Sequence, residues 1–204
     1  YTFTDDEYEA DVILINTCCF IGDAKEESVN TILEMAELKK TGQCKALIVA
    51  GCMAQRYKEE IMQEIPEVDG ILGTSTYDEI SDVIRQALSG QEHISCFHDL
   101  SVLPDVKEKR LVTTGGHYAF LKIAEGCDKR CTYCIIPYLR GPYRSVPMER
   151  LLEQAEELAE QGVKELILVA QETTLYGVDL YGRKALPELL RKLAAVSRIQ
   201  WIRI

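Results

Sequence analysis

Three cysteines, Cys127, Cys131 and Cys134, follow one another in a CxxxCxxC pattern. Three thiolates at this spacing can hold three corners of a four-iron–four-sulfur cluster, because soft thiolates are the ligands that such clusters prefer. One iron would then lack a protein ligand and could bind a substrate or cofactor directly. From the spacing alone, two alternatives stand beside the cluster: a zinc knuckle without its fourth ligand, and a redox CxxC pair with an unrelated third cysteine.

Two further cysteines follow predicted strands. Cys18 comes after the apolar run 11–16, and Cys52 comes after the apolar run 46–50. Such continuous apolar runs are typical of parallel strands covered on both faces, and ligands bind at the carboxyl ends of such strands. We therefore expect Cys18 and Cys52 to converge at one sheet edge. Each alone also fits a buried small apolar residue, so the pattern leaves both roles open.

Alternating strands and helices must position these cysteines. The periodicity predicts an α/β protein with a doubly wound, flavodoxin-like N-terminal domain over 1–90, a linker over 91–116 and a second βα array over 117–204. The linker is assigned where the periodicity is lost and proline, glycine and a charged run appear. The predicted strands cover 11–16, 46–50, 68–73, 118–123, 165–170 and 200–204, and the predicted helices cover 24–40, 54–65, 77–89, 147–161 and 187–196.

Composition restricts the class of protein only modestly. The chain has 204 residues, a net charge of −10 and eight cysteines. Because the N-terminus is acidic and unlike a signal peptide, the cysteines indicate metal ligation in the cytoplasm rather than disulfides. The acidic balance disfavours broad nucleic-acid binding and suits a basic protein partner. No apolar run approaches the ~18 residues of a membrane span, so we expect no membrane partner.

The sequence around the triad resembles the radical SAM superfamily, and in particular its methylthiotransferase branch. The similarity runs from about Asp11 to the chain end and rests on several motifs. These are 118–127 with Cys131-Thr-Tyr-Cys134, Ile135-Ile-Pro-Tyr-Leu-Arg-Gly141, Arg144-Ser145, 162–177, Asn16-Thr-Cys-Cys-Phe-Ile21, Ala24-Lys-Glu-Glu-Ser28 and Gly51-Cys-Met-Ala-Gln-Arg-Tyr57.

This resemblance implies two four-iron–four-sulfur clusters and S-adenosylmethionine as cofactors. The triad would sit after the first strand of a partial (βα) barrel, of which only the first part is present, and S-adenosylmethionine would bind its open iron. The auxiliary cluster would be held by Cys18, Cys52 and a cysteine upstream of Tyr1. Tyr133 would lie by the cofactor adenine, and Gln171, at the end of the second barrel strand, would face the active site.

Basic residues near the triad have two interpretations. These side chains form either a solvated face with ordinary ion pairs, or a group of positive charges around an anionic cluster that orients the cluster and its cofactor. The residues are Lys122, Lys129, Arg130, Arg140 and Arg144.

The family resemblance also implies an activity. A radical derived from S-adenosylmethionine would remove hydrogen from an unactivated carbon, which would then receive a methylthio group. The motifs resemble the branch that modifies an aspartate β-carbon of a small-subunit ribosomal protein, with transfer RNA adenosine as the alternative substrate and an electron donor protein as a second partner. The chain would be a fragment, inactive by itself, without the extreme N-terminus and the C-terminal half. A non-catalytic iron–sulfur or zinc-binding module is the alternative from a different class.

Overall fold

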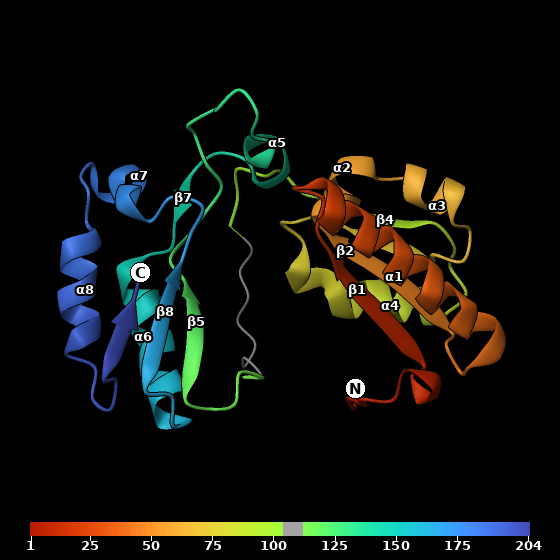
Figure 1. Ribbon diagram of the computed structural model, residues 1–204, viewed down its shortest axis with the longest axis horizontal. Coiled ribbons are helices and arrows are strands. Elements are labelled where there is room, and N and C mark those ends of the chain that lie inside the picture. Colours follow the sequence, from red (N-terminus) through yellow and green to blue (C-terminus); the bar gives the residue numbers. More distant parts are fainter. Residues whose placement is uncertain (104–111) are drawn as a thin grey trace. The chain divides into compact units, whose positions relative to one another are not determined.

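The computed structural model describes residues 1–103 and 112–204, so the central part of the expected linker lies outside the described residues. The chain divides into two compact units, Tyr1–Val106 and Lys107–Ile204. Figure 1 shows a parallel sheet with helices in each of them. Each unit has an α/β architecture, in agreement with the predicted fold class.

The first unit is built on four parallel strands in the order β1-β2-β3-β4. β1 and β2 pair along their whole length, from Val12 opposite Ala46 to Thr17 opposite Gly51, so they end at the same level. The first three strands fall where the apolar runs predict them. The strands are β1 (Val12–Thr17), β2 (Ala46–Gly51), β3 (Gly70–Leu72) and β4 (Ile94–Cys96).

Helices cover both faces of this sheet. Alternate β2 residues, Ala46, Ile48 and Ala50, join one buried cluster whose helical members come from α4 and the turn before it. α1 packs against β1 and β2 but contributes no residue to that cluster, so it lies on the opposite face. The unit is therefore doubly wound, as predicted. Its helices are α1 (Gly22–Thr41), α2 (Cys52–Tyr57), α3 (Glu60–Glu64) and α4 (Ile80–Leu88), with short 3₁₀ turns η1 (Glu7–Glu9) and η2 (Tyr77–Glu79).

One predicted helix, 54–65, is wrong. The structure has two short helices there, because the backbone at Lys58 takes a positive φ of 46° and ends α2. α2 also begins earlier than predicted, at Cys52, directly after β2. The chain therefore turns from strand to helix at a cysteine, without an intervening loop.

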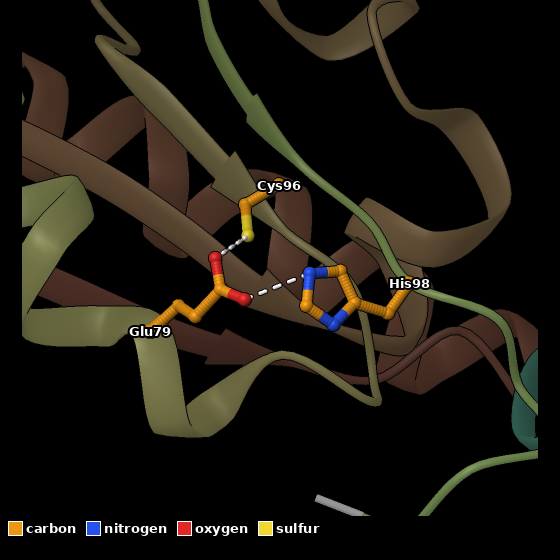
Figure 2. A group of neighbouring side chains, drawn as sticks. All are labelled: Glu79, Cys96 and His98. Carbon is orange, nitrogen blue, oxygen red and sulfur yellow. Dashed lines mark hydrogen bonds and ion pairs between the residues drawn. The ribbon is translucent and has the colours of Figure 1, made fainter.

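The segment expected as a linker contributes a strand to the first unit. β4 pairs with β3, Ile94 lying opposite Gly70 and Cys96 opposite Leu72. A strand of three residues is too short to give a periodic pattern, so the sequence analysis missed it. The end of β4 brings Cys96 beside Glu79 and His98, as Figure 2 shows.

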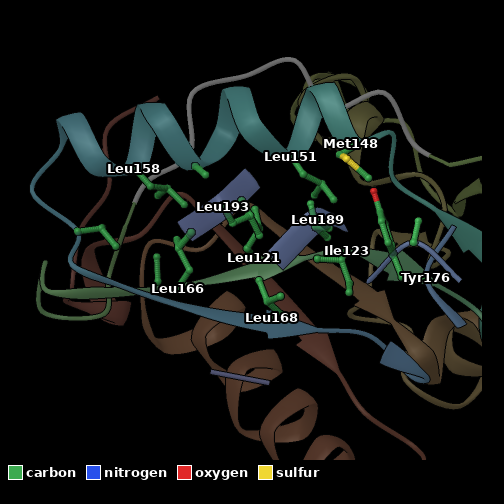
Figure 3. Packing of buried hydrophobic residues seen from close by; sticks show 14 residues of the cluster. Leu121, Ile123, Met148, Leu151, Leu158, Leu166, Leu168, Tyr176, Leu189 and Leu193 are labelled. Atoms are coloured by element: carbon green, nitrogen blue, oxygen red, sulfur yellow. The ribbon is translucent and has the colours of Figure 1, made fainter. Parts of the chain in front are cut away.

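The second unit is built on three parallel strands in the order β5-β8-β9, all of them predicted. Two helices pack on the sheet, and Figure 3 shows leucines of α6 meeting those of the strands. The buried cluster includes Leu121, Leu151, Leu166 and Leu189. The strands are β5 (Tyr118–Lys122), β8 (Glu165–Val169) and β9 (Trp201–Arg203), and the helices are α6 (Met148–Glu160) and α8 (Leu186–Ala194).

The two faces of this sheet differ in burial. Leu121 and Leu168 are buried against the helices, whereas Phe120 and Val169 on the other face are about two-fifths exposed, at 42% and 40%. This alternation is that of strands in a βα barrel, where one face meets the helices and the other faces the interior.

A long loop leaves β5 and returns before α6. Its two ends pair as a short antiparallel ribbon, in which Ala124 lies opposite Ser145 and Glu125 lies opposite Arg144. The ribbon closes the loop that carries the CxxxCxxC triad. The remaining elements are β6 (Ala124–Glu125), α5 (Ile136–Arg140), β7 (Arg144–Ser145), η3 (Thr173–Leu175) and α7 (Val178–Tyr181). Within the described residues, every helix is too short or too polar to cross a membrane.

Candidate functional site

The three cysteines of the triad lie in the loop that follows β5 and β6. Cys127 and Cys134 are half-buried, Cys131 is exposed, and all three are free thiols. The Cys127 amide donates to Gly141 O over 3.1 Å, and the Cys134 amide donates to Cys131 O over 3.0 Å. The first bond ties the start of the loop to its end, and the second closes a tight turn between the last two cysteines.

The spacing of these thiols bears on the zinc alternative. Thiolates that share one zinc ion lie about 3.8 Å apart, given a Zn–S bond of about 2.3 Å and tetrahedral geometry. In the part of the chain that the structure describes, the three triad sulfurs are not gathered within 4.8 Å of one another. Ligands of a four-iron cluster bind different irons and so lie farther apart than ligands of one ion. Among the described residues, the three sulfurs therefore do not form the compact donor set of a single zinc ion.

Gly126 allows the triad loop to start in its observed conformation. Its φ is +78°, and a Cβ at this position would lie 2.1 Å from Pro142 O and 2.6 Å from Gly141 O. Both atoms belong to the backbone of the returning segment, which is held by the β6–β7 pairing. A side chain here would force the two ends of the loop apart.

A buried carboxylate, Glu125, precedes the loop. Its Oε2 pairs with Arg140 Nη1 at 3.4 Å and with Lys122 Nζ. Its Oε1 accepts from Gln171 Nε2 over 2.9 Å and from the Gly126 amide over 3.3 Å. Burial alone would raise the pKa of Glu125, but the charges of Lys122 and Arg140 outweigh it and the pKa is lowered. Glu125 is thus an anion that fixes the Gln171 side chain.

Gln171 lies where the sequence analysis expected it, two residues beyond the end of β8. Its Nε2 is engaged by Glu125, while its Oε1 is buried and has no hydrogen-bond partner among the described residues. A buried carbonyl oxygen without a donor is uncommon in folded proteins. It leaves an acceptor beside the triad loop that a ligand with an amino group could satisfy.

A second set of contacts braces the triad loop. Lys129, between the first two cysteines, forms an ion pair with Glu172. The Tyr143 hydroxyl donates to Glu172 O over 2.9 Å, and the Tyr143 amide donates to Asp128 Oδ1 over 3.1 Å. The hydrogen-bonded ion pair with Lys129 lowers the pKa of Glu172 to about 2, and burial raises the pKa of Tyr143 to about 12. Tyr133, by contrast, is 87% exposed.

These contacts resolve part of the question about the basic residues. Lys122 and Arg140 pair with Glu125, and Lys129 pairs with Glu172. Arg144 Nη2 donates to Arg140 O over 2.9 Å. Ordinary ion pairs therefore account for three of the five basic side chains.

The sequence analysis did not single out Glu125 or Tyr143. For Glu125 the sequence did contain a signal, because this charged residue stands directly after an apolar strand run and directly before Gly-Cys. A carboxylate buried at a strand end needs a polar or charged partner. Tyr143 had no such signal, because its partners Asp128 and Glu172 are distant in sequence.

The other cysteine pair lies in the first unit. Cys18 and Cys52 follow Thr17 and Gly51, which are paired at the ends of β1 and β2. The structure thus brings these two cysteines to neighbouring strand ends, as expected. Gly51 has φ +95°, and a Cβ there would meet Asn16 Oδ1 and Thr17 O at 2.6 Å, so glycine permits this close approach.

The surroundings of Cys18 and Cys52 differ. Cys18 is exposed, and its amide donates to Ser28 Oγ over 3.1 Å. Cys52 is buried at the start of α2, and its carbonyl accepts from Cys19 Sγ over 3.2 Å. Burial raises the pKa of the Cys19 thiol, which keeps it protonated. Cys44 is also buried and donates to Ala46 O over 3.4 Å, in keeping with a packing role.

Two protein-family models match the chain. Residues 1–73 match the uncharacterized protein family UPF0004, and residues 121–204 match the radical SAM superfamily. The second match includes the end of β5, the triad loop and β8. The second unit of the chain is therefore similar to the radical SAM superfamily. Radical SAM proteins use a four-iron–four-sulfur cluster and S-adenosylmethionine, and the triad loop described above has ligands suited to the cluster.

Three similar curated proteins are named ribosomal protein uS12 methylthiotransferase RimO. The RimO of Lachnoclostridium phytofermentans is 67% identical over 204 residues, which are 100% of this chain and 46% of that protein. The RimO of Acetivibrio thermocellus is 53% identical, with the same coverage of both chains. The RimO of Clostridium tetani is 50% identical over 98% of this chain and 45% of that protein. The chain spans about half the length of the curated relatives it matches.

Two solved structures are similar in fold to this chain. Both are of the radical S-adenosylmethionine methyltransferase TsrM from Kitasatospora setae, with TM-scores of 0.55 and 0.54 and identities of 11% and 10%. They match 89% of this chain and 39% and 40% of TsrM. One holds tryptophan and an analogue of S-adenosylmethionine, and the other holds cobalamin and a [4Fe-4S] cluster. At this identity the likeness concerns the fold alone.

Proposed function

We propose that the protein containing this chain is a radical SAM methylthiotransferase that modifies an aspartate β-carbon of ribosomal protein uS12. The observation that carries the proposal is the 67% identity to a RimO protein over all 204 residues, across both units. The closed triad loop after β5 supports it, since this loop offers three free thiols next to a parallel sheet. A ribosomal-protein substrate implies a cytoplasmic enzyme, and reduction of a cluster implies an electron donor protein.

Cys127, Cys131 and Cys134 would hold the cluster to which S-adenosylmethionine binds. When bound, the cluster and its cofactor supply the radical chemistry needed to attack an unactivated carbon. The chain's own part is to present three thiolates in the loop after β5, whose ends are joined by the β6–β7 ribbon.

Gln171 and Glu125 would orient S-adenosylmethionine. The unsatisfied Gln171 Oε1 is an acceptor for the cofactor's amino group, and Glu125 fixes the amide by accepting from its Nε2. Lys122 and Arg140 keep Glu125 ionised, so it remains an acceptor at neutral pH. Tyr133, exposed between Cys131 and Cys134, would pack against the adenine.

Cys18 and Cys52 would supply two ligands of an auxiliary cluster. Both lie at the carboxyl ends of neighbouring parallel strands, where doubly wound sheets bind ligands. The inserted sulfur would come from this auxiliary cluster.

In the test, the full-length enzyme is incubated with uS12 and bulk transfer RNA together. The incubation is anaerobic and contains reductant, sulfide and S-adenosylmethionine. Mass spectrometry should find a methylthio group on an aspartate-containing peptide of uS12. A methylthio group on transfer RNA adenosine instead would contradict the proposed substrate. If neither product formed although both clusters were loaded, the result would contradict the methylthiotransferase assignment.

Matched variants check the cofactor residues. Cys131→Ala should abolish the modification and the change that S-adenosylmethionine causes in the electron-spin signal of the reduced protein. Cys44→Ala, which removes a buried thiol outside both sites, should retain both. Tight binding of zinc in place of iron by the triad would favour a non-catalytic metal module.

A further inference from the structure

Three side chains with different ligand atoms meet at the end of β4, apart from both cysteine sites (Figure 2). Glu79 is the last residue of η2, Cys96 is the last residue of β4, and His98 follows two residues later. Glu79 Oε2 lies 3.1 Å from Cys96 Sγ, and Glu79 Oε1 lies 2.7 Å from His98 Nε2. Across the described ranges, 1–103 and 112–204, this is the one group of three or more such residues whose ligand atoms all lie within 4.8 Å of one another.

The donor set is one that zinc accepts. A cysteine sulfur, an imidazole nitrogen and a carboxylate oxygen are its usual protein ligands, and three of them leave a fourth position open to water. Tetrahedral bonds of about 2.0–2.3 Å put such donors about 3.3–3.5 Å apart. Cys96 Sγ and His98 Nε2 lie 3.1 Å and 2.7 Å from different Glu79 oxygens. One ligand atom from each of the three residues lies within 4.8 Å of the others, so side-chain rotations can bring the three donors to the separations that zinc needs.

Charge is balanced in such a site. A thiolate and a carboxylate together carry two negative charges, and a neutral imidazole adds none, so a divalent cation gives a neutral group. Without a metal, the Cys96 thiol donates a hydrogen bond to Glu79 Oε2, and His98 Nε2 lies beside Glu79 Oε1. Binding the metal would release the thiol proton, and the neutral imidazole would carry its proton on Nδ1 instead of Nε2.

The backbone around the group is fixed from the loop that leads to Glu79. Thr76 Oγ1 donates to Cys96 O over 3.1 Å, and Ser75 Oγ donates to His98 O over 3.3 Å. Both hydroxyl residues are buried. Contacts of this kind hold ligand-bearing segments in place around metal ions. The His98 side chain is half exposed, at 50%, and gives an ion access from solvent.

We propose that Glu79, Cys96 and His98 bind one divalent transition-metal ion, with the ligand preferences of zinc. The site is distinct from the auxiliary cluster. Although β2 and β4 end at the same sheet edge, β3 lies between them, and two strand spacings amount to about 10 Å. The proposal depends only on residues of the first unit and stands or falls independently of the substrate proposed above.

Cobalt(II) and zinc are the probes. The chain is prepared with Cys18, Cys52, Cys127, Cys131 and Cys134 all replaced by serine, so that the iron–sulfur sites bind neither ion. We expect one equivalent of cobalt(II) with a thiolate charge-transfer band and the visible bands of tetrahedral cobalt, and displacement of cobalt by zinc. In this background His98→Ala, Cys96→Ser and Glu79→Gln should each weaken zinc binding by at least about tenfold, measured by calorimetry.

Two matched variants control for indirect effects. His93→Ala removes an exposed imidazole from the same segment, and Cys44→Ser removes a buried thiol, and both should leave the affinity unchanged. Binding without the thiolate band, or an equal loss with His93→Ala, would overturn the proposal.

A second measurement serves if the serine background fails to fold. The unsubstituted chain is reconstituted anaerobically with iron and sulfide, exposed to zinc and desalted, and its metals are counted by mass spectrometry. His98→Ala should lose one zinc and no iron. Loss of iron in Cys96→Ser would assign Cys96 to the auxiliary cluster and overturn the separate site.

Discussion

Gln171 Nε2 donates a hydrogen bond to Glu125 Oε1 over 2.9 Å, and this bond joins the segments that follow two neighbouring parallel strands, β5 and β8. Because the Cys127 loop starts directly after Glu125, the bond links the triad to the second strand of the sheet. It also leaves the other end of the Gln171 amide as the buried acceptor described above. The Glu125–Gln171 hydrogen bond therefore fixes the position of the acceptor that a cofactor beside the triad would meet.

Replacing Glu125 with glutamine should destabilise the second unit. The variant keeps the shape of the side chain but removes the charge that Lys122 and Arg140 face. Breaking a buried ion pair is costly, and the exposure of Lys122 moderates the loss, so we expect about 1–3 kcal/mol in urea unfolding. The control is Glu156→Gln, an exposed position of α6 where the change should be below about 0.5 kcal/mol. Equal unfolding midpoints for the two variants would contradict the role given to Glu125.

Gly126→Ala should disrupt the triad loop. The new Cβ would overlap the backbone at Pro142 O and also require a positive φ, so we expect a loss of at least about 3 kcal/mol and poor iron binding at the triad. Gly162→Ala is the matched control, because φ there is +100° but nothing lies within 4 Å of the added Cβ. That variant should lose only about 1–2 kcal/mol, the cost of the left-handed backbone. If both variants lost the same folding stability, the close approach of the Pro142 backbone to position 126 would not contribute to the cost.

Glu172→Gln should change how stability depends on pH. The folded-state pKa of Glu172 is lowered to about 2 by its hydrogen-bonded ion pair with Lys129, against about 4.3 in an unfolded chain. A depressed carboxylate pKa stabilises the fold above the unfolded value, and that stabilisation is lost as pH falls toward the folded value. The wild-type chain should therefore be more stable than the variant at pH 6, by a small margin because the pair is near solvent, and the difference should vanish toward pH 2.

This pH dependence is measured by urea unfolding of the cluster-free chain between pH 6 and pH 2. Glu156→Gln again serves as the control, since it should leave the wild-type profile unchanged. A stability difference between Glu172→Gln and the wild type that stayed constant across this range would exclude the Lys129 pair as its cause.

Leu121→Ala and Phe120→Ala should differ in how much they destabilise the second unit, although the two residues are neighbours. Leu121 is fully buried in the cluster under α6 and α8, and its truncation should cost about 2–5 kcal/mol. Phe120 points to the other face of β5 and is 42% exposed, so its truncation should cost less than about 1 kcal/mol. Thermal or urea unfolding distinguishes them, and a larger loss at Phe120 would mean that the strand presents its faces the other way.

Much of the architecture follows from local patterns. Apolar runs and helical periodicity predicted six of the strands and four of the helices, because burial of one face imposes a repeat that is visible in the sequence. The convergence of Cys18 and Cys52 was also predictable, since parallel strands joined by helices end at the same edge of a sheet. The CxxxCxxC spacing alone grouped the three cysteines as ligand candidates, because all three lie within eight residues, but it left a cluster, a zinc knuckle and a redox pair open.

Other features depend on residues that are far apart in the chain. The strand β4 forms because the edge of β3 offers hydrogen bonds, and its three residues carry no pattern of their own. α2 ends at Lys58 because the backbone there has a positive φ, and no glycine or proline in the sequence indicates this conformation. The contacts of Glu125 with Gln171, and of Glu79 with Cys96, join positions 46 and 17 residues apart. Sequence periodicity determined which faces are buried, whereas only the packing of the strands decided which polar side chains meet at their ends.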